Sequence, residues 1–354
     1  MNDATVTART LTDGGQEPLE IARVVAEFVG GARRSLDLAI YDFKLLPETA
    51  ALVGEAIREA ARRGVGVRIL YNVDHRNPIP VPPPPEPDAV LIGSLEVPAK
   101  AIAGVPDLMH HKFVVRDAET VWTGSTNWTD DSWSREENVI VVAGSKELAH
   151  AYILSFEQLW DGGSVEQSGR VEPRPVEIGS TEVRPWFTPG HGEELSHRIA
   201  KAIGRAKRRV RVCSPVITAA PVLATLAQVA SDGKVDLAGV VDATQIRQVI
   251  YQWQTNGVTG WKIPLLRTVI ERASFSGKDS IPWEPQSVHN FMHAKITVAD
   301  DVVFTGSFNL SHSGERNAED VLEIHDGRLA DELAGFIDGV RGRYGPVSLE
   351  PLPR

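Results

Sequence analysis

The sequence predicts an α/β protein made of two copies of one domain, each a mostly parallel sheet flanked by helices, related by a pseudo-twofold axis. Three observations predict this fold class. The 354 residues suit about two domains. Each half shows strand–helix–strand order, which favours parallel strands joined by helical crossovers. A histidine–lysine motif also occurs twice, 183 residues apart. The three observations together indicate an internal duplication.

The two halves repeat the same four features in the same order. These are a basic turn, an alternating apolar strand, an alanine-rich helix that ends near a glycine, and a second apolar strand. In the first half they are Arg33-Arg34, the strand that follows it, a helix over 48–63 before Gly64, and a strand over 65–74. In the second half they are Lys207 to Arg209, the strand that follows, a helix over 221–230 before Gly233, and a strand over 234–242.

The predicted domain boundaries follow from composition. Residues 1–162 form the first domain, 163–180 a linker rich in Gly, Ser, Glu and Pro, and 181–354 the second domain. The halves differ most in their middle loops. The first loop, 77–87, is proline-rich and unsuited to a sheet, and the second, 253–283, is longer and carries tryptophans.

Composition excludes several classes of protein. A hydrophobic fraction of 42% and a charged fraction of 24% are ordinary for a globular chain. The net charge of −10 means that any nucleic-acid binding needs a local basic patch. The one cysteine, Cys213, can form neither an internal disulfide nor a cysteine-based zinc site, and we expect it to be buried. The polar N-terminus lacks the apolar core of a signal peptide, so we expect a cytoplasmic protein.

The repeated motif carries the chemistry. Its first copy contains His110, Lys112 and Asp117, and its second contains His293, Lys295 and Asp300 at identical spacing. Each copy is preceded by a methionine and followed by a Gly-Ser-x-Asn segment and then by an acid before an apolar strand. These later positions are Ser125, Asn127 and Glu137 in the first half, and Ser307, Asn309 and Glu319 in the second. The ordered repetition makes chance a poor explanation.

The residue types suit attack on a phosphodiester. Histidine and lysine two apart on a strand share one face. Lys112 and Lys295 can offset the charge of the phosphate and of the transition state. One neutral imidazole can attack phosphorus, and a second, protonated imidazole can protonate the leaving oxygen. A single site therefore needs both His110 and His293. A metal ion and a cofactor are not expected, because a cation beside two lysines is repelled.

This series of motifs resembles the phospholipase D superfamily, the HKD phosphodiesterases, over nearly the whole chain. The resemblance implies that both motifs meet at a pseudo-twofold interface and that the reaction passes through a phosphohistidine without a metal. Family members with two motifs in one chain often use the first, which points to His110 as the nucleophile and His293 as the acid and then the base.

Supporting roles follow from the same resemblance. Ser125, Asn127, Ser307 and Asn309 look like donors to phosphate oxygens or supports for the lysines. Glu137 and Glu319 look like carboxylates that hold each imidazole by its far nitrogen. Asp117 and Asp300, at strand ends, are expected to be structural or electrostatic supports. His111 points to the opposite face, and His289 is the one further histidine considered as a candidate for lining the site.

Three functions remain open for the substrate and the reaction. Apolar loops before each histidine favour a phospholipid slightly, with hydrolysis or transfer and with peripheral membrane contact. A metal-independent nuclease is the alternative, supported by stacking aromatics such as Trp128, Trp133, Trp261 and Phe308. An inactive scaffold of the same fold is the third. The only partner required is the phosphodiester substrate, because one chain carries both motifs and needs no protein partner for one site.

Overall fold

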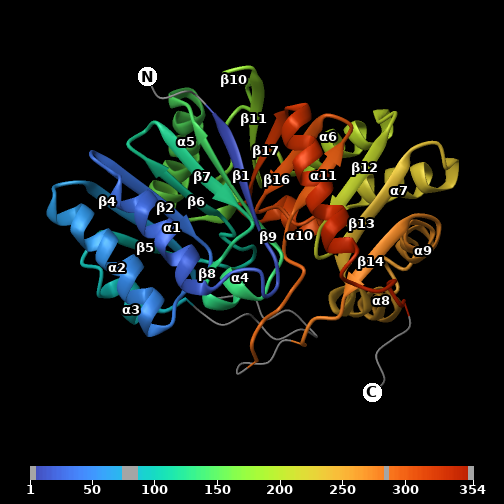
Figure 1. The fold of residues 1–354 in the computed structure, drawn as a ribbon, viewed down its shortest axis with the longest axis horizontal. Helices are drawn as coiled ribbons and strands as arrows, with labels where there is room; N and C mark the ends of the chain where they lie inside the picture. Colours follow the sequence, from blue (N-terminus) through green and yellow to red (C-terminus); the bar gives the residue numbers. More distant parts are fainter. Residues whose placement is uncertain (1–4, 74–86, 283–286, 350–354) are drawn as a thin grey trace.

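The structure is a computed structural model that describes residues 5–73, 87–282 and 287–349. It contains two α/β halves side by side, each with one large sheet (Figure 1). The first sheet has seven strands in the order β1-β9-β7-β6-β2-β4-β5, and the second has eight in the order β10-β11-β17-β16-β15-β12-β13-β14. A short third pairing joins β3 to β8. The α/β class and the duplication predicted from the sequence are confirmed.

The first half contains the following elements: β1 (Val6–Leu11), α1 (Pro18–Gly30), β2 (Ser35–Ile40), β3 (Phe43–Lys44), α2 (Pro47–Arg62), β4 (Gly66–Val73), α3 (Ala89–Gly93), β5 (Ala99–Ala103), β6 (Lys112–Arg116), β7 (Thr120–Gly124), β8 (Trp128–Thr129), α4 (Asp130–Ser134), β9 (Asn138–Gly144) and α5 (Lys146–Gly162).

The second half contains the following elements: a 3-10 turn (Val165–Gln167), β10 (Val176–Ile178), β11 (Thr181–Phe187), α6 (Gly192–Arg205), β12 (Arg209–Cys213), α7 (Ala220–Asp232), β13 (Asp236–Asp242), α8 (Ala243–Asn256), α9 (Lys262–Arg272), β14 (Ser274–Lys278), β15 (Ile296–Ala299), β16 (Val302–Gly306), α10 (His312–Arg316), β17 (Asp320–His325) and α11 (Gly327–Arg341).

The sheets are mixed, which corrects the prediction that they are mostly parallel. Among the described strands, β2–β4–β5 and β12–β13–β14 run parallel, and the remaining pairs of both large sheets run antiparallel. The reason is the tight connection after each motif strand. Asp117 and Asp300 adopt φ values of 58° and 53° in the turns to β7 and β16, and such short turns join antiparallel strands only.

The predicted helices form where the sequence places them. In α2, Val53 and Ile57 are buried on one face, as the 3.6-residue period requires. Gly64, two residues beyond α2, has φ +87°. Gly233 ends α7 in the left-handed conformation with φ 60°, which glycine adopts without the Cβ clash of other residues.

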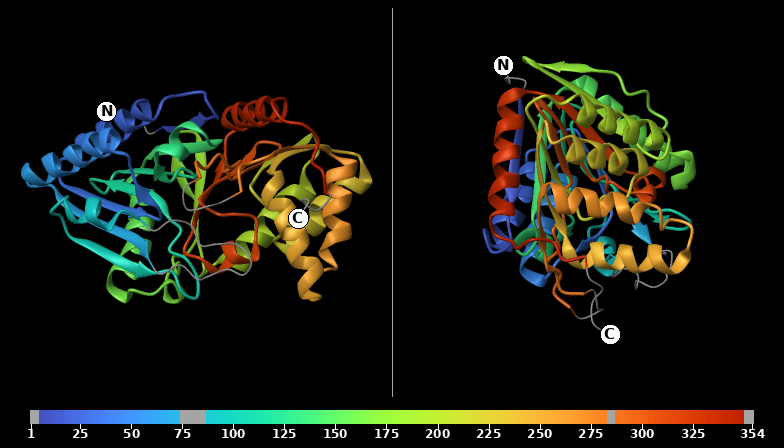
Figure 2. Two further views of the ribbon diagram at one scale, coloured as in Figure 1. Left: turned by 90° about the horizontal axis from the view of Figure 1, so that it is seen from below. Right: turned by 90° about the vertical axis from the view of Figure 1, so that its right-hand side faces the viewer.

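The two halves share a central core. One buried cluster contains Tyr152 and Phe156 of α5 together with Leu333 and Ile337 of α11 and apolar side chains of both sheets. Helix α5 reaches β11 of the second half, and α11 reaches β1 of the first. Separate outer cores lie under α1 and α2 and under α6, α7 and α9, and Figure 2 shows these helices on the outside of the molecule. The shared core fixes the relative position of the two halves.

The segment between the halves is partly ordered as strand. Helix α5 ends at Gly162, and β10, within the predicted linker 163–180, pairs with β11. Most of the proline-rich loop 77–87, and Trp283 at the end of the second loop, lie outside the described residues. Among the residues that the structure describes, no helix combines the length and apolar composition needed to cross a bilayer.

Candidate active site

Two backbone bridges bring the motifs together across the interface between the halves. The His110 N–H donates to the carbonyl of Ala318 at 2.8 Å, and the His293 N–H donates to the carbonyl of Glu137 at 3.1 Å. Met109 and Met292, just before the histidines, form isolated bridges with the same two partners. Each histidine is therefore positioned by the residues that lead into the last strand of the opposite half.

A second pair of contacts supports the same two methionines. The Met109 N–H donates to Asn72 Oδ1 at 2.8 Å, and the Met292 N–H donates to Asp242 Oδ2 at 3.1 Å. Asn72 and Asp242 lie near or at the carboxyl ends of β4 and β13. Sequence reasoning missed this role, although the polar residues that close these apolar strands were a usable signal.

The two lysines are buried beside the histidines. Lys112 is 1% exposed and Lys295 is 3% exposed. Each ammonium donates to the carbonyl of the histidine two residues earlier, Lys112 at 2.7 Å and Lys295 at 2.6 Å. Burial lowers the pKa of Lys112 to about 8, and burial together with Lys112 holds the pKa of Lys295 well below its usual value. Burying two positively charged lysines costs free energy, and an anion bound in this site offsets part of that cost.

His110 is held by a carboxylate of the other half. Its Nδ1 lies 2.6 Å from Glu319 Oε2, and the Glu319 side chain is inaccessible to solvent. Burial raises the pKa of Glu319 to about 7, against the opposing effect of Lys112. Burial and the two lysines lower the pKa of His110 well below its usual value. A neutral ring that donates Nδ1–H to Glu319 leaves a lone pair on Nε2, as a nucleophile requires.

His293 has a different environment. Its Nδ1 lies 3.1 Å from the amide oxygen of Asn138, and the carboxylate of Glu136 is 3.5 Å away. The Asn138 amide nitrogen in turn donates to Glu136 at 3.1 Å. Burial raises the pKa of Glu136 to about 7, while burial and the lysines hold the pKa of His293 well below its usual value.

The expectation that Glu137 holds an imidazole is corrected by the strand register. Gly124 pairs with Ile140, sixteen residues on, whereas Gly306 pairs with Val321, fifteen residues on. The first half has one extra residue in this segment, so Asn138 is the structural counterpart of Glu319. The carboxylate of Glu137 instead binds Lys278 at 2.9 Å and the hydroxyl of Tyr344.

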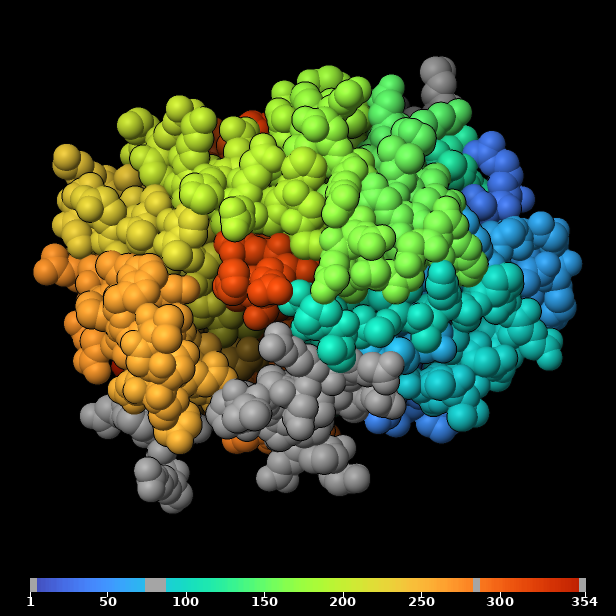
Figure 3. All heavy atoms as spheres, turned by 180° about the vertical axis from the view of Figure 1, so that it is seen from behind, coloured from blue at the N-terminus to red at the C-terminus, as the bar shows by residue number. Residues whose placement is uncertain are grey.

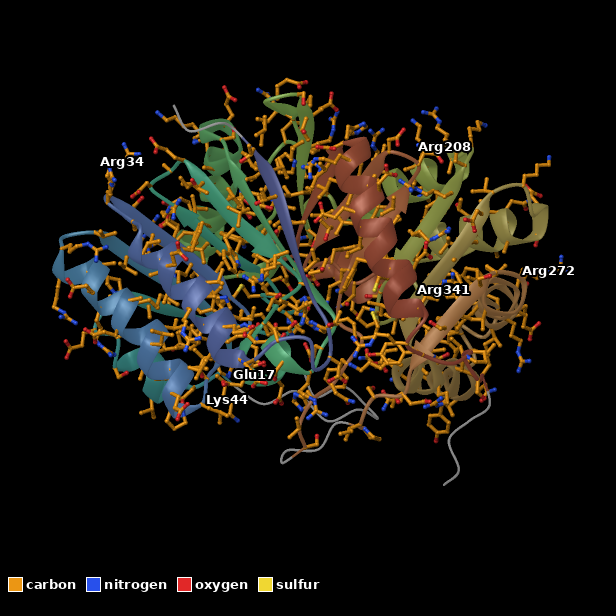
Figure 4. All side chains as sticks on the ribbon, in the orientation of Figure 1. Glu17, Arg34, Lys44, Arg208, Arg272 and Arg341 are labelled. Atoms are coloured by element: carbon orange, nitrogen blue, oxygen red, sulfur yellow. The ribbon has the colours of Figure 1, made fainter. Side chains whose placement is uncertain are left out.

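The motif aspartates lie away from the histidines. Asp117 accepts from the backbone N–H groups of Arg33, Arg34 and Ser35, and Asp300 accepts from those of Lys207, Arg208 and Arg209. Figure 4 places Arg34 and Arg208 at the upper edge of the molecule and Lys44 at the lower edge. Asp117 lies five residues beyond Lys112 along β6, which is about 17 Å. This geometry fits the structural role expected for both aspartates.

The Gly-Ser-x-Asn residues divide into two kinds. Ser125 Oγ donates at 2.7 Å to Asn138, which is the partner of His293. Ser307 Oγ accepts from the Asp320 N–H at 3.0 Å, next to Glu319, which is the partner of His110. The side-chain oxygens of Asn127 and Asn309 are buried and have no hydrogen-bond partner in the described part of the chain. Such amides are available to a bound phosphate once the side chain turns its N–H₂ toward it.

The remaining candidates have structural surroundings. His111 is fully buried with Nδ1 3.1 Å from Asp320, and the His289 ring stacks on Phe291. Cys213 is buried, as expected. The described ranges contain no group of three or more His, Cys, Asp or Glu side chains arranged to hold a metal ion.

Comparisons with known proteins agree with this fold and with the doubled site. The model of the family "Cardiolipin synthase, PLD-like domain" matches twice, at residues 25–160 and 199–339. The chain therefore belongs to the phospholipase D superfamily. It is 14% identical to phosphatidylserine synthase of Haemophilus influenzae Rd KW20, with a TM-score of 0.66 over 95% of this chain and 86% of that one. At this identity, the likeness concerns the fold.

The similar curated proteins are mitochondrial cardiolipin hydrolases. The human protein is 25% identical over 137 residues, which is 37% of this chain and 47% of that protein. The Xenopus laevis protein is 29% identical over 133 residues, or 37% of this chain and 57% of that protein. The chain thus spans about half the length of the curated relatives it matches.

Proposed function

We propose that this protein is a phosphodiesterase that cleaves a phospholipid through a covalent phosphohistidine on His110. The observation that carries the proposal is the group of two histidines and two buried lysines contributed by both halves, with buried His110 held by Glu319. The membership of the phospholipase D superfamily and the similarity to cardiolipin hydrolases support the same reaction class.

The first step forms one bond and breaks another at phosphorus. Nε2 of neutral His110 attacks phosphorus, the bond to the leaving oxygen breaks, and that oxygen takes a proton from His293. Lys112 and Lys295 offset the charge that develops on the phosphoryl oxygens. In the second step, His293 removes a proton from water or an alcohol, whose oxygen displaces His110 from phosphorus.

The unequal partners of the histidines support these roles. The ring of His110 acquires positive charge when Nε2 bonds to phosphorus, and the Glu319 carboxylate at 2.6 Å stabilises that charge. The direct partner of His293 is the neutral amide of Asn138. A bound phosphodiester offsets the two lysines that lower the pKa of His293, which favours the protonated form that the first step needs.

The distribution of exposed apolar side chains supports a lipid substrate. Of nine large apolar side chains exposed in the described part of the chain, eight lie on segments that follow the carboxyl ends of parallel strands, where the motifs begin. They are Leu46, Val90, Val105, Tyr251, Val258, Trp261, Ile281 and Val288. We call these eight side chains the apolar rim, and their position at the end of the sheets where the motifs begin suits a substrate presented by a membrane surface.

One residue of this rim, Trp261, is linked to the site through its neighbour Lys262. Trp261 is 57% exposed, and the ammonium of its neighbour Lys262 donates to the carbonyl of Thr218 at 2.8 Å. The N–H of Thr218 donates to the carbonyl of Leu310, which directly follows Asn309. Figure 1 shows α3, α4 and α8 along the lower edge of the molecule. Figure 3 shows α10, in orange-red, at the surface between the two halves.

A nuclease is the alternative, and the charges favour it less. The net charge is −10. The basic turns at Arg34 and Arg208 lie at the edge opposite to Lys44 (Figure 4). Nucleic-acid binding needs basic groups near the reacting phosphate, because phosphate contacts dominate its affinity.

Trapping of the intermediate tests the mechanism. With bis-p-nitrophenyl phosphate in excess EDTA, wild type and His293→Ala should form an acid-labile, base-stable phosphoenzyme, because the activated leaving group needs little protonation. His110→Ala should form none. A label on His293 alone, or turnover that requires an added metal, would overturn this mechanism.

Substrate assays test the choice of lipid. Phospholipid vesicles should be cleaved faster than single- or double-stranded DNA and RNA. Trp261→Ser should lower activity on vesicles at least fivefold while activity on soluble bis-p-nitrophenyl phosphate stays within twofold. Leu154→Ser, on α5 away from the rim, is the matched control and should change neither. Preferential cleavage of nucleic acid would favour the nuclease.

A further inference from the structure

Asp42 is an acid that only the first half places beside the active site. Ala39 pairs with Phe113 and Cys213 pairs with Ile296, the residues after the two motif lysines. Phe43 pairs with Trp128 and Ile217 bridges to Leu310, each just after a Gly-Ser-x-Asn segment. Both registers make Val216 the counterpart of Asp42. The pseudo-twofold symmetry of the fold therefore does not account for this carboxylate.

One carboxylate oxygen of Asp42 is buried without a hydrogen-bond donor among the described residues. Asp42 is 7% exposed, and its Oδ1 has no partner in the described part of the chain. Its backbone carbonyl is occupied, because it accepts from the Trp128 N–H at 2.9 Å. A buried carboxylate oxygen without a donor is costly, so a ligand that supplies a donor would be stabilised there.

Charged groups from four segments face this carboxylate. They are Lys112 on β6, Lys44 on β3, Asp131 on α4 and Glu136 just before β9. Lys112 donates to the carbonyl of His110, and Glu136 lies 3.5 Å from the His293 ring. Asp42 is thus coupled to the groups that surround both histidines, on the side of Lys112.

Offsetting the charge of Lys112 does not explain why Asp42 is present. Glu319 and Asp320 already act on Lys112 more strongly than Asp42 does. A further negative charge also opposes binding of an anionic phosphodiester, unless the substrate brings a donor or a cation to it.

We propose that Asp42 is a specificity residue, whose carboxylate accepts a hydrogen bond from a hydroxyl or ammonium group on the alcohol part of the substrate. The proposal rests on the proposed phosphodiesterase function and narrows its substrate class. A glycerol headgroup offers the hydroxyl and an ethanolamine headgroup offers the ammonium, each close to phosphorus. A methyl ester offers neither. Loss of a buried hydrogen-bond partner discriminates strongly between such substrates.

Short-chain phospholipids below their micelle concentration test this proposal without a membrane surface. The probes are dihexanoyl phosphatidylglycerol, phosphatidylethanolamine and phosphatidylmethanol, with bis-p-nitrophenyl phosphate as a generic diester. Asp42→Asn should lower kcat/KM at least tenfold for the glycerol or the ethanolamine ester and less than threefold for the other two substrates. The ester that is affected identifies hydroxyl or ammonium as the recognised group.

Two further variants keep the test decisive. Val216→Asn alters the half-buried counterpart in the second half and should leave the selectivity unchanged. Asp42→Glu moves the carboxylate by one methylene and should alter the ratio between headgroups more than the rate on the generic diester. An equal loss on all four substrates by folded Asp42→Asn, or no loss on any, would overturn the proposal. Wild type that cleaves no diester at all would instead reject the proposed phosphodiesterase function.

Discussion

His110 Nδ1 and Glu319 Oε2 lie 2.6 Å apart across the interface between the two halves, although the residues are 209 positions apart in sequence. Asn317 supports this carboxylate from behind, with its amide nitrogen 3.2 Å from Glu319 Oε1. At the other histidine the order of the groups is reversed, since the amide of Asn138 is in front and the carboxylate of Glu136 behind. The site is symmetric in backbone and asymmetric in charge, so the two histidines are not equivalent.

This asymmetry predicts a large effect of Glu319→Gln. The glutamine keeps an acceptor for Nδ1–H but no longer offsets positive charge on the ring, so the step that forms phosphohistidine should slow. We expect a loss of roughly 10²-fold in that step, as for removal of one preorganised electrostatic group. Rapid-quench measurement of the rate at which the phosphoenzyme forms checks this prediction. A loss below threefold would mean that Glu319 does not stabilise the intermediate.

Glu137→Gln is the matched control for this prediction. Glu137 binds Lys278, which is nearly inaccessible and whose remaining carboxylate partner is Asp13 at 3.2 Å. Removing the charge of Glu137 weakens the bond to buried Lys278, which costs stability, here about 1–3 kcal/mol. Glu137→Gln should therefore lower the melting temperature more than Glu319→Gln, and it should slow phosphoenzyme formation less. If Glu137→Gln slowed phosphoenzyme formation more than Glu319→Gln and lowered the melting temperature less, Glu137 would have the role that the sequence predicted for it.

Anion binding should be coupled to proton uptake. Burial, followed by the two lysines, lowers the pKa of both histidines, and burial lowers the pKa of Lys112 to about 8. A bound anion offsets the lysines and raises these pKa values, so the occupied site holds more protons near neutral pH. Sulfate, which does not titrate in this range, should bind with proton uptake and lose affinity as pH rises from 7 to 9. Calorimetry in two buffers of different ionisation enthalpy measures this, and proton release on binding would contradict it.

The aspartates of the motif should affect stability rather than turnover. Asp117 accepts three backbone hydrogen bonds in the turn before β2, far along β6 from the histidines. We expect Asp117→Ala to destabilise the fold by about 2–3 kcal/mol, as for loss of bonds to a charged acceptor. The kcat of the folded fraction should stay within threefold. Asp300→Ala should behave alike, and a large fall in kcat with unchanged melting would contradict the structural role.

Much of the fold and the centre of the site could be predicted from the sequence. The repeated order of strands and helices predicted the duplication, and the paired motifs predicted that His110, Lys112, His293 and Lys295 meet. The mixed sheets were missed because the helical crossovers reveal only the parallel part, whereas the return strands depend on turns at Asp117 and Asp300. Glu136 and Asn138 were missed because an extra residue shifts the register by one place. A shift of one residue in a strand exchanges the faces of neighbouring side chains.

Asp42 offers a last prediction, on stability as a function of pH. Burial raises the pKa of Asp42 from its usual 3.8 to about 7. Between these two values the unfolded chain is ionised while the folded protein remains protonated. The folded state therefore loses stability as pH rises from about 4 to about 7, and the loss is complete above the folded pKa. From pH 5 to pH 8 the loss from this group is about 2.5 kcal/mol. Asp42→Asn removes it, so denaturant unfolding of the variant should show a smaller fall in stability over that range than wild type does. An equal fall in both proteins would show that Asp42 ionises in the folded state as it does in water.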